Sequence, residues 1–142
     1  MRDFLTEEQE QRVVREIHNA ETRTTGEIRI VISSKRVFRP EKYAWKAFRR
    51  MGMSKTEARN GALIVVMVRH RRFFVLGDQG LNAVVEPDYW ENLALAMSEE
   101  LKNGERCEAL IHGVKTLTDT MAHHWPADGE NPNELPDEIA YD

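Results

Sequence analysis

The chain has 142 residues, 41% of them hydrophobic and 31% charged, which is typical of one globular domain with a hydrophobic core. Its formal net charge is −4, yet residues 127–142 hold acidic residues and no Lys or Arg, so the rest of the chain carries about +2. A body this close to neutral carries no strong signal for nucleic-acid binding. The single cysteine, Cys107, rules out an internal disulfide. Since it has neither an apolar leader nor an apolar run long enough to span a membrane, the chain is predicted to be cytoplasmic.

The first half of the chain predicts a helix, a strand and a second helix. Residues 6–9 have the form of a capping box, and the helical spacing of the apolar residues that follow predicts a helix over residues 7–22. Alternation from residue 27 to residue 34 predicts a strand that is buried mainly on one face. Pro40 suits the first turn of the second helix, which Gly52 ends.

The second half predicts a hairpin followed by two helices. Residues 62–68 are apolar throughout, so this strand is expected at the centre of the sheet, with helices on both faces. Residues 72–76 return as its antiparallel partner after a short link. One helix is predicted from Pro87 to Gly104, and the last helix ends near His124. The predicted fold class is an α/β sandwich of order α-β-α-β-β-α-α, with a small mixed sheet whose first two strands are parallel.

One domain is predicted over residues 1–126, followed by an acidic C-terminal tail over residues 127–142. The tail is rich in Asn, Pro and Asp and has no hydrophobic periodicity. It is therefore expected either to be disordered or to lie on the surface.

Side chains with oxygen atoms stand at three strand ends that this topology brings to one edge of the sheet. Glu27 begins the first strand, Asn60 precedes the second, and Asp78 follows the third. Carboxylate and amide oxygens are the ligands that Ca²⁺ and Mg²⁺ prefer, so we expect a divalent-cation site there, to which Asp88 could add a fourth ligand. We call Glu27, Asn60 and Asp78 the acidic edge. The alternative is plain turn chemistry, because Asp and Asn often cap backbone groups.

The opposite end of the sheet is predicted to be basic. The predicted anion-binding or partner-binding residues are Lys35 and Arg36 after the first strand, and Arg69, Arg71 and Arg72 at the hairpin tip. We call these residues the basic end. It is predicted to bind phosphate or an acidic partner, and the acidic tail could fold back onto it. The alternative is a solvated hairpin tip whose charges discourage aggregation.

Three ordered motifs resemble the TPM domain, a family formerly known as a domain of unknown function. They are Thr25-Gly26-Glu27-Ile28, Arg59-Asn60-Gly61-Ala62-Leu63-Ile64 and Leu76-Gly77-Asp78-Gln79-Gly80. The resemblance covers roughly residues 6–126, and the ending from His123 to Pro126 is similar to that of a compact soluble subgroup.

The resemblance implies an α/β sandwich, calcium binding and a weak phosphatase-like activity. That activity would depend on Glu27, Asp78 and Asp88. Relatives also act in photosystem repair and as auxiliary subunits of a receptor, so the fold does not fix the function. Many relatives are exported or membrane-anchored. Because calcium is scarce in cytoplasm, a cytoplasmic location favours magnesium or no metal here.

Two functions stay open from the sequence. The first is a non-enzymatic or weakly active TPM-like domain that binds an unknown partner protein and carries a Ca²⁺ or Mg²⁺ site, without an organic cofactor. The alternative is a metal-dependent phosphatase-like hydrolase, in which a cation polarises a phosphoryl oxygen and a carboxylate orients water. The chain has no phosphate loop of the form GxxxxGK[ST] and no obvious nucleophile, so its catalytic residues stay unidentified and the interaction module is favoured.

Overall fold

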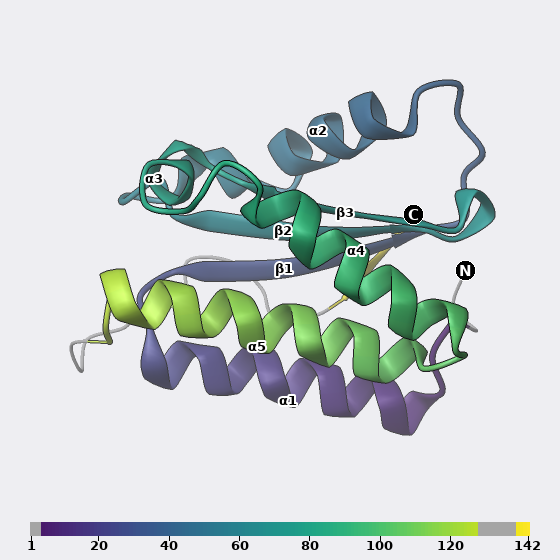
Figure 1. Ribbon diagram of the computed structural model, residues 1–142, viewed down its shortest axis with the longest axis horizontal. Coiled ribbons are helices and arrows are strands. Elements are labelled where there is room, and N and C mark those ends of the chain that lie inside the picture. The colour runs from purple at the N-terminus through teal and green to yellow at the C-terminus, as the bar shows by residue number, and fades with distance from the viewer. Residues whose placement is uncertain (1–3, 128–138) are drawn as a thin grey trace.

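The computed structural model describes residues 4–127 and 139–142. Four strands form one mixed sheet, in the order β3-β2-β1-β4 (Figure 1). They are β1 (Glu27–Ser33), β2 (Gly61–Met67), β3 (Arg72–Gly77) and β4 (Ala140–Tyr141). β1 runs parallel to β2 and to β4, and β2 runs antiparallel to β3. The predicted α/β sandwich with a parallel first pair and a mixed sheet is confirmed.

Helices cover both faces of this sheet. The long helices are α1 (Glu7–Arg23), α2 (Pro40–Arg50), α4 (Tyr89–Lys102) and α5 (Arg106–His124), and the short ones are η1 (Met53–Lys55), η2 (Val68–His70) and α3 (Gln79–Asn82). Figure 1 shows α2 on one face, with α1 and α5 side by side on the other. No helix in the described part of the chain is both long and apolar enough to cross a bilayer.

The pleat of the strands divides the apolar residues into two cores. In β2, Ile64 and Val66 pack with residues of α1, α4 and α5, whereas Leu63 and Val65 pack with residues of α2. All seven residues of β2 are buried, as predicted for a central strand. The prediction that β1 is buried mainly on one face is wrong, because α2 also covers its second face and buries Val31 completely.

The end of the predicted acidic tail joins the sheet as β4. Ala140 and Tyr141 pair with β1, and the side chain of Ile139 is buried in the core. The Asp142 carboxylate forms ion pairs with Lys35 at 3.2 Å and with Arg50 at 3.3 Å. The other acidic residues of the tail, Asp128, Glu130, Glu134, Asp137 and Glu138, lie outside the described residues. The domain boundary at residues 126 and 127 stays a prediction.

Candidate functional site

The structure brings the three residues of the acidic edge to one edge of the sheet. Glu27 is paired with Gly61, and the Asp78 backbone N–H donates to the Gly61 carbonyl at 3.0 Å, so both lie beside the start of β2. Asn60 directly precedes that strand. All three side chains are buried, with exposed fractions of 5% for Glu27, 1% for Asn60 and 7% for Asp78.

The two carboxylates of this edge lie on either side of β2. Because β1 and β3 flank β2, Glu27 and Asp78 are two strand spacings apart, or about 10 Å between backbones. Gly61 lies between them, and a Cβ added there would be 2.7 Å from the Met53 carbonyl oxygen. The backbone of η1 therefore packs against the sheet between the two acids. Across the described residues, no group of three or more His, Cys, Asp or Glu side chains is close enough together to hold a metal ion.

Arg59 balances the charge of Asp78 directly. Its Nε donates to Asp78 Oδ2 at 2.6 Å and its Nη2 donates to Oδ1 at 3.0 Å, a bidentate pair. Asp78 Oδ1 also accepts the Gln79 backbone N–H at 2.8 Å, which caps the short helix α3. The hydrogen bond with Asp78 raises the pKa of the Arg59 guanidinium above its usual value. Arg59 immediately precedes Asn60 but was not among the predicted site residues.

Asn60 holds a buried polar group that lacks a partner. Its backbone N–H donates to Thr56 Oγ1 at 3.2 Å, but its side-chain Nδ2 has no hydrogen-bond partner among the described residues. Leaving such a group unpaired costs about 1–3 kcal/mol. In this orientation the amide offers a donor, whereas exchange of its nitrogen and oxygen positions would offer the carbonyl oxygen that a cation requires.

Asp88, the fourth predicted ligand, differs from the other three. It lies in the turn before α4, its side chain is exposed, and it makes no capping hydrogen bond. Two residues later Trp90 packs so closely on β3 that a Cβ added at Gly77 would be 2.2 Å from its ring. Trp90 Nε1 also donates to Asn82 Oδ1 at 2.6 Å. This end of β3 is therefore covered by a packed aromatic side chain.

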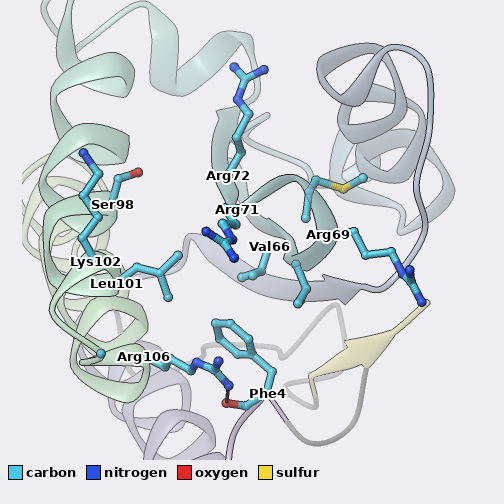
Figure 2. A pocket seen from close by; sticks show the side chains of 12 residues that line it. Phe4, Val66, Arg69, Arg71, Arg72, Ser98, Leu101, Lys102 and Arg106 are labelled. Carbon is cyan, nitrogen blue, oxygen red and sulfur yellow. Dashed lines mark hydrogen bonds between the residues drawn. The ribbon is translucent and has the colours of Figure 1, made fainter.

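The opposite end of the sheet contains a cavity of about 880 Å³ (Figure 2). Arg69, Arg71 and Arg72 of the hairpin tip line it, together with Lys102 of α4 and Arg106 of α5. We call this cavity the basic pocket. No described residue that lines it is acidic. Lys102 and Arg106 were not among the predicted residues, because hydrophobic periodicity does not predict which helix ends lie beside the hairpin tip.

Lys35 and Arg36 lie outside this pocket. Both are exposed, and Lys35 pairs with Asp142 as described above. The loop that follows them is attached to the hairpin tip, because His70 Nε2 accepts the Val37 backbone N–H at 3.1 Å. The predicted basic end is therefore divided into a neutralised part at Lys35 and the basic pocket at Arg71.

Comparison with known proteins identifies the family. The TPM domain model matches residues 1–120, so the chain belongs to the TPM domain family, as its motifs predicted. The NMR structure of the BA42 protein from the psychrophilic bacterium Bizionia argentinensis is similar, with a TM-score of 0.89 and 32% identity over 98% of this chain and 96% of that chain.

A second solved structure shares the fold. It is the solution NMR structure of the N-terminal domain of a P. gingivalis protein, with a TM-score of 0.72 and 20% identity over 86% of this chain and 79% of that chain. No curated protein matches the sequence significantly. The comparisons therefore give the family and the fold but no activity.

Proposed function

We propose that this TPM domain is a non-enzymatic interaction module and that its basic end binds an acidic partner protein. The observation that carries the proposal is the basic pocket, in which five cationic residues and no acidic residue among those described line one cavity. Like charges gathered around a cavity repel one another and attract an anionic surface. A bound partner would neutralise a repulsion that the free domain leaves uncompensated.

The acidic edge also favours an interaction module over a hydrolase. The Asp78 carboxylate already accepts three hydrogen bonds, two from Arg59 and one from Gln79, which use most of its roughly four lone-pair positions and leave little to ligate a cation or orient water. Ser33, a residue with a hydroxyl nucleophile, is fully buried, and its Oγ accepts the Lys35 backbone N–H at 3.2 Å. Both observations support an interaction module over a hydrolase.

Binding of a fluorescein-labelled oligoglutamate peptide, measured by fluorescence anisotropy, tests the proposal. We expect saturable binding that weakens with added salt and weakens further in the Lys102→Glu variant. Arg15→Glu, which makes the same kind of charge change at an exposed position of α1, should retain more of the affinity. Absence of saturable binding, or equal losses in the two variants, would contradict the proposal.

A cation site at the acidic edge is the second candidate. It is supported by the gathering of Glu27, Asn60 and Asp78 at one edge and by the unpaired Asn60 amide. A Ca²⁺ or Mg²⁺ ion must displace Arg59 from Asp78, so Arg59→Gln should bind either ion more tightly than the wild type in calorimetry. If neither protein releases or absorbs heat on addition of either ion, the acidic edge is not a cation site.

The phosphatase-like alternative depends on the same residues and has its own test. Turnover of para-nitrophenyl phosphate with Mg²⁺ present should be absent from the wild type if the domain is purely an interaction module. Turnover that disappears in Asp78→Asn would instead favour a hydrolase. The cytoplasmic location stays a prediction, which fractionation of expressing cells would check.

A further inference from the structure

The basic pocket has an apolar floor beneath its charged rim. Phe4, Val66 and Leu101 contribute carbon atoms to its wall, and Phe4 and Val66 are almost fully buried, at 4% and 1% exposure. We infer that the pocket receives an acidic peptide segment of the partner that carries one large apolar side chain, which inserts between Arg71 and Arg106. This inference rests on the proposed function and names the chemistry of the partner.

Arg71 and Arg106 place charge at the mouth of the pocket. Figure 2 shows Arg71 pointing into the cavity and Arg106 beside Phe4 at its lower end. The Arg106 Nη1 donates to the Phe4 carbonyl at 3.2 Å, and its guanidinium carbon lies 4.9 Å from the centre of the Phe4 ring. Because these contacts already restrict Arg106, less side-chain freedom is lost when a carboxylate binds it.

Arg71 occupies a backbone conformation that ordinary residues avoid. Its φ of 51° and ψ of 44° lie in the left-handed region, where glycine is favoured. The hairpin therefore carries a strained arginine at the position where glycine would fit best. Arg59 at the acidic edge has a similar φ of 53°, so what sets Arg71 apart is that it also lines the cavity.

The apolar floor accounts for the apolar side chain in the inferred partner. Leu101 is half-buried on α4, and Val66 lies on the core face of β2. A phenyl ring placed against these carbon atoms removes apolar surface from water, which an anion alone does not achieve. The cavity volume of about 880 Å³ lies in the range typical of ligand sites, so it has room for a ring and its flanking backbone.

The outer arginines favour a peptide over a small anionic molecule. Both line the rim of the cavity, and Figure 2 shows the Arg72 side chain pointing to the top of the view and the Arg69 side chain pointing to the right. The Arg72 guanidinium lies 4.5 Å from the centre of the Phe74 ring, and Arg72 also lines a neighbouring hollow, in which Arg39, Lys42 and Arg49 outnumber the one acidic residue, Glu41. A molecule confined to the cavity would not reach Arg39, Lys42 and Arg49 in the neighbouring hollow. An extended segment spans about 3.3 Å per residue, so acidic residues that flank the apolar side chain could extend past Arg72 into that hollow.

Two labelled peptides that differ at one residue test the inference by anisotropy. They are Asp-Glu-Glu-Phe-Glu-Glu-Asp and the same peptide with Ala in place of Phe. We expect the Phe peptide to bind wild-type protein at least about tenfold more tightly. Arg71→Gly should reduce the affinity for both peptides by about fivefold or more. Leu101→Gln should reduce the preference for the Phe peptide while retaining affinity for the Ala peptide.

The outcomes separate failure of the inference from failure of the proposed function. Equal affinity for the two peptides would overturn the apolar anchor and leave the acidic partner intact, whereas absence of binding by either would overturn both. Phe-peptide binding that Arg71→Gly does not weaken would place the site elsewhere and overturn the inference. Decyl phosphate is the competitor that tests for a small anionic ligand. If it displaces the Phe peptide and has the higher affinity of the two, the inferred peptide is wrong and the site binds a small anionic molecule. Circular dichroism of each variant confirms that the variant is folded.

Discussion

The two ends of the sheet differ in whether their charged side chains are balanced by a neighbouring charge. At the acidic edge Asp78 is buried, and its charge is balanced by Arg59 within the same edge. In the basic pocket Arg71 and Arg106 are exposed, and no acidic residue among those described lines the cavity with them. Buried oxygen atoms at converging strand ends can therefore serve packing, while the charge of the basic pocket, which no described lining residue balances, supports the proposed partner surface.

The largest expected effect is on the packing of the acidic edge. Gly61→Ala places a methyl group 2.7 Å from the Met53 carbonyl oxygen, a backbone atom that has little freedom to move. We expect the free energy of unfolding to fall by about 2 kcal/mol in urea titrations. Gly104→Ala is the control, because nothing lies within 4 Å of the added carbon and the cost comes only from its positive φ.

A small loss of stability in Gly61→Ala, no larger than in the Gly104 control, would contradict this description of the edge. It would mean that η1 moves easily away from β2. An open edge of that kind would strengthen the case for a cation between Glu27 and Asp78.

The opposite sign is expected at the basic pocket. Arg71→Gly relieves a left-handed backbone and removes one member of a cluster of like charges. We therefore expect the free energy of unfolding to stay constant or rise by up to about 1 kcal/mol, even though peptide affinity falls. Thermal and urea unfolding measure the first quantity. A clear loss of stability would show that Arg71 supports the fold instead of serving a partner.

The neutralised part of the basic end should contribute little to stability. Asp142→Asn removes the ion pairs with Lys35 and Arg50, whose side chains are 54% and 49% exposed. Solvent screens such pairs, so the expected loss is about 0.5 kcal/mol and should shrink further in high salt. A loss that salt does not change would mean that β4 is held by these charges more firmly than their exposure indicates.

The smallest effect concerns Cys107, which lies next to Arg106 but is buried. Burial raises the pKa of its thiol, so the folded protein keeps the proton at a pH where the unfolded chain loses it. Stability should therefore be full below the unfolded pKa of about 8.5 and decline slightly as the pH rises above it. Urea titrations on either side of that pH, with Cys107→Ala as control, check this. A decline of the same size in the variant would assign it to another group.

The sequence predicted the fold well because its strongest signals are long. The apolar run at residues 62–68 and the helical spacing of apolar residues over residues 7–22 both reflect burial over many residues. β4 was missed because Ala140 and Tyr141 are too few to show a period. The second buried face of β1 was missed because the cover comes from α2, and its pattern alone does not indicate which face of the sheet it packs on.

The candidate sites were predictable in place but not in detail. Strand direction alone placed Glu27 and Asp78 at one edge, and it placed Arg71 at the other. The pairing of Arg59 with Asp78 depends on side-chain orientation at the open end of the hairpin formed by β2 and β3, which residue spacing does not encode. Lys102 and Arg106 join the pocket only because α4 and α5 meet beside the hairpin.

The most direct measurement of which end binds a partner is a nitrogen–proton correlation spectrum of labelled protein, titrated with the Phe-containing acidic peptide. We expect the backbone amide signals of Arg71, Leu101 and Arg106 to shift in a saturable way, while those of Glu27, Asn60 and Asp78 stay in place. Saturable shifts centred on Asn60 and Asp78, with the Arg71 signal unmoved, would contradict the account.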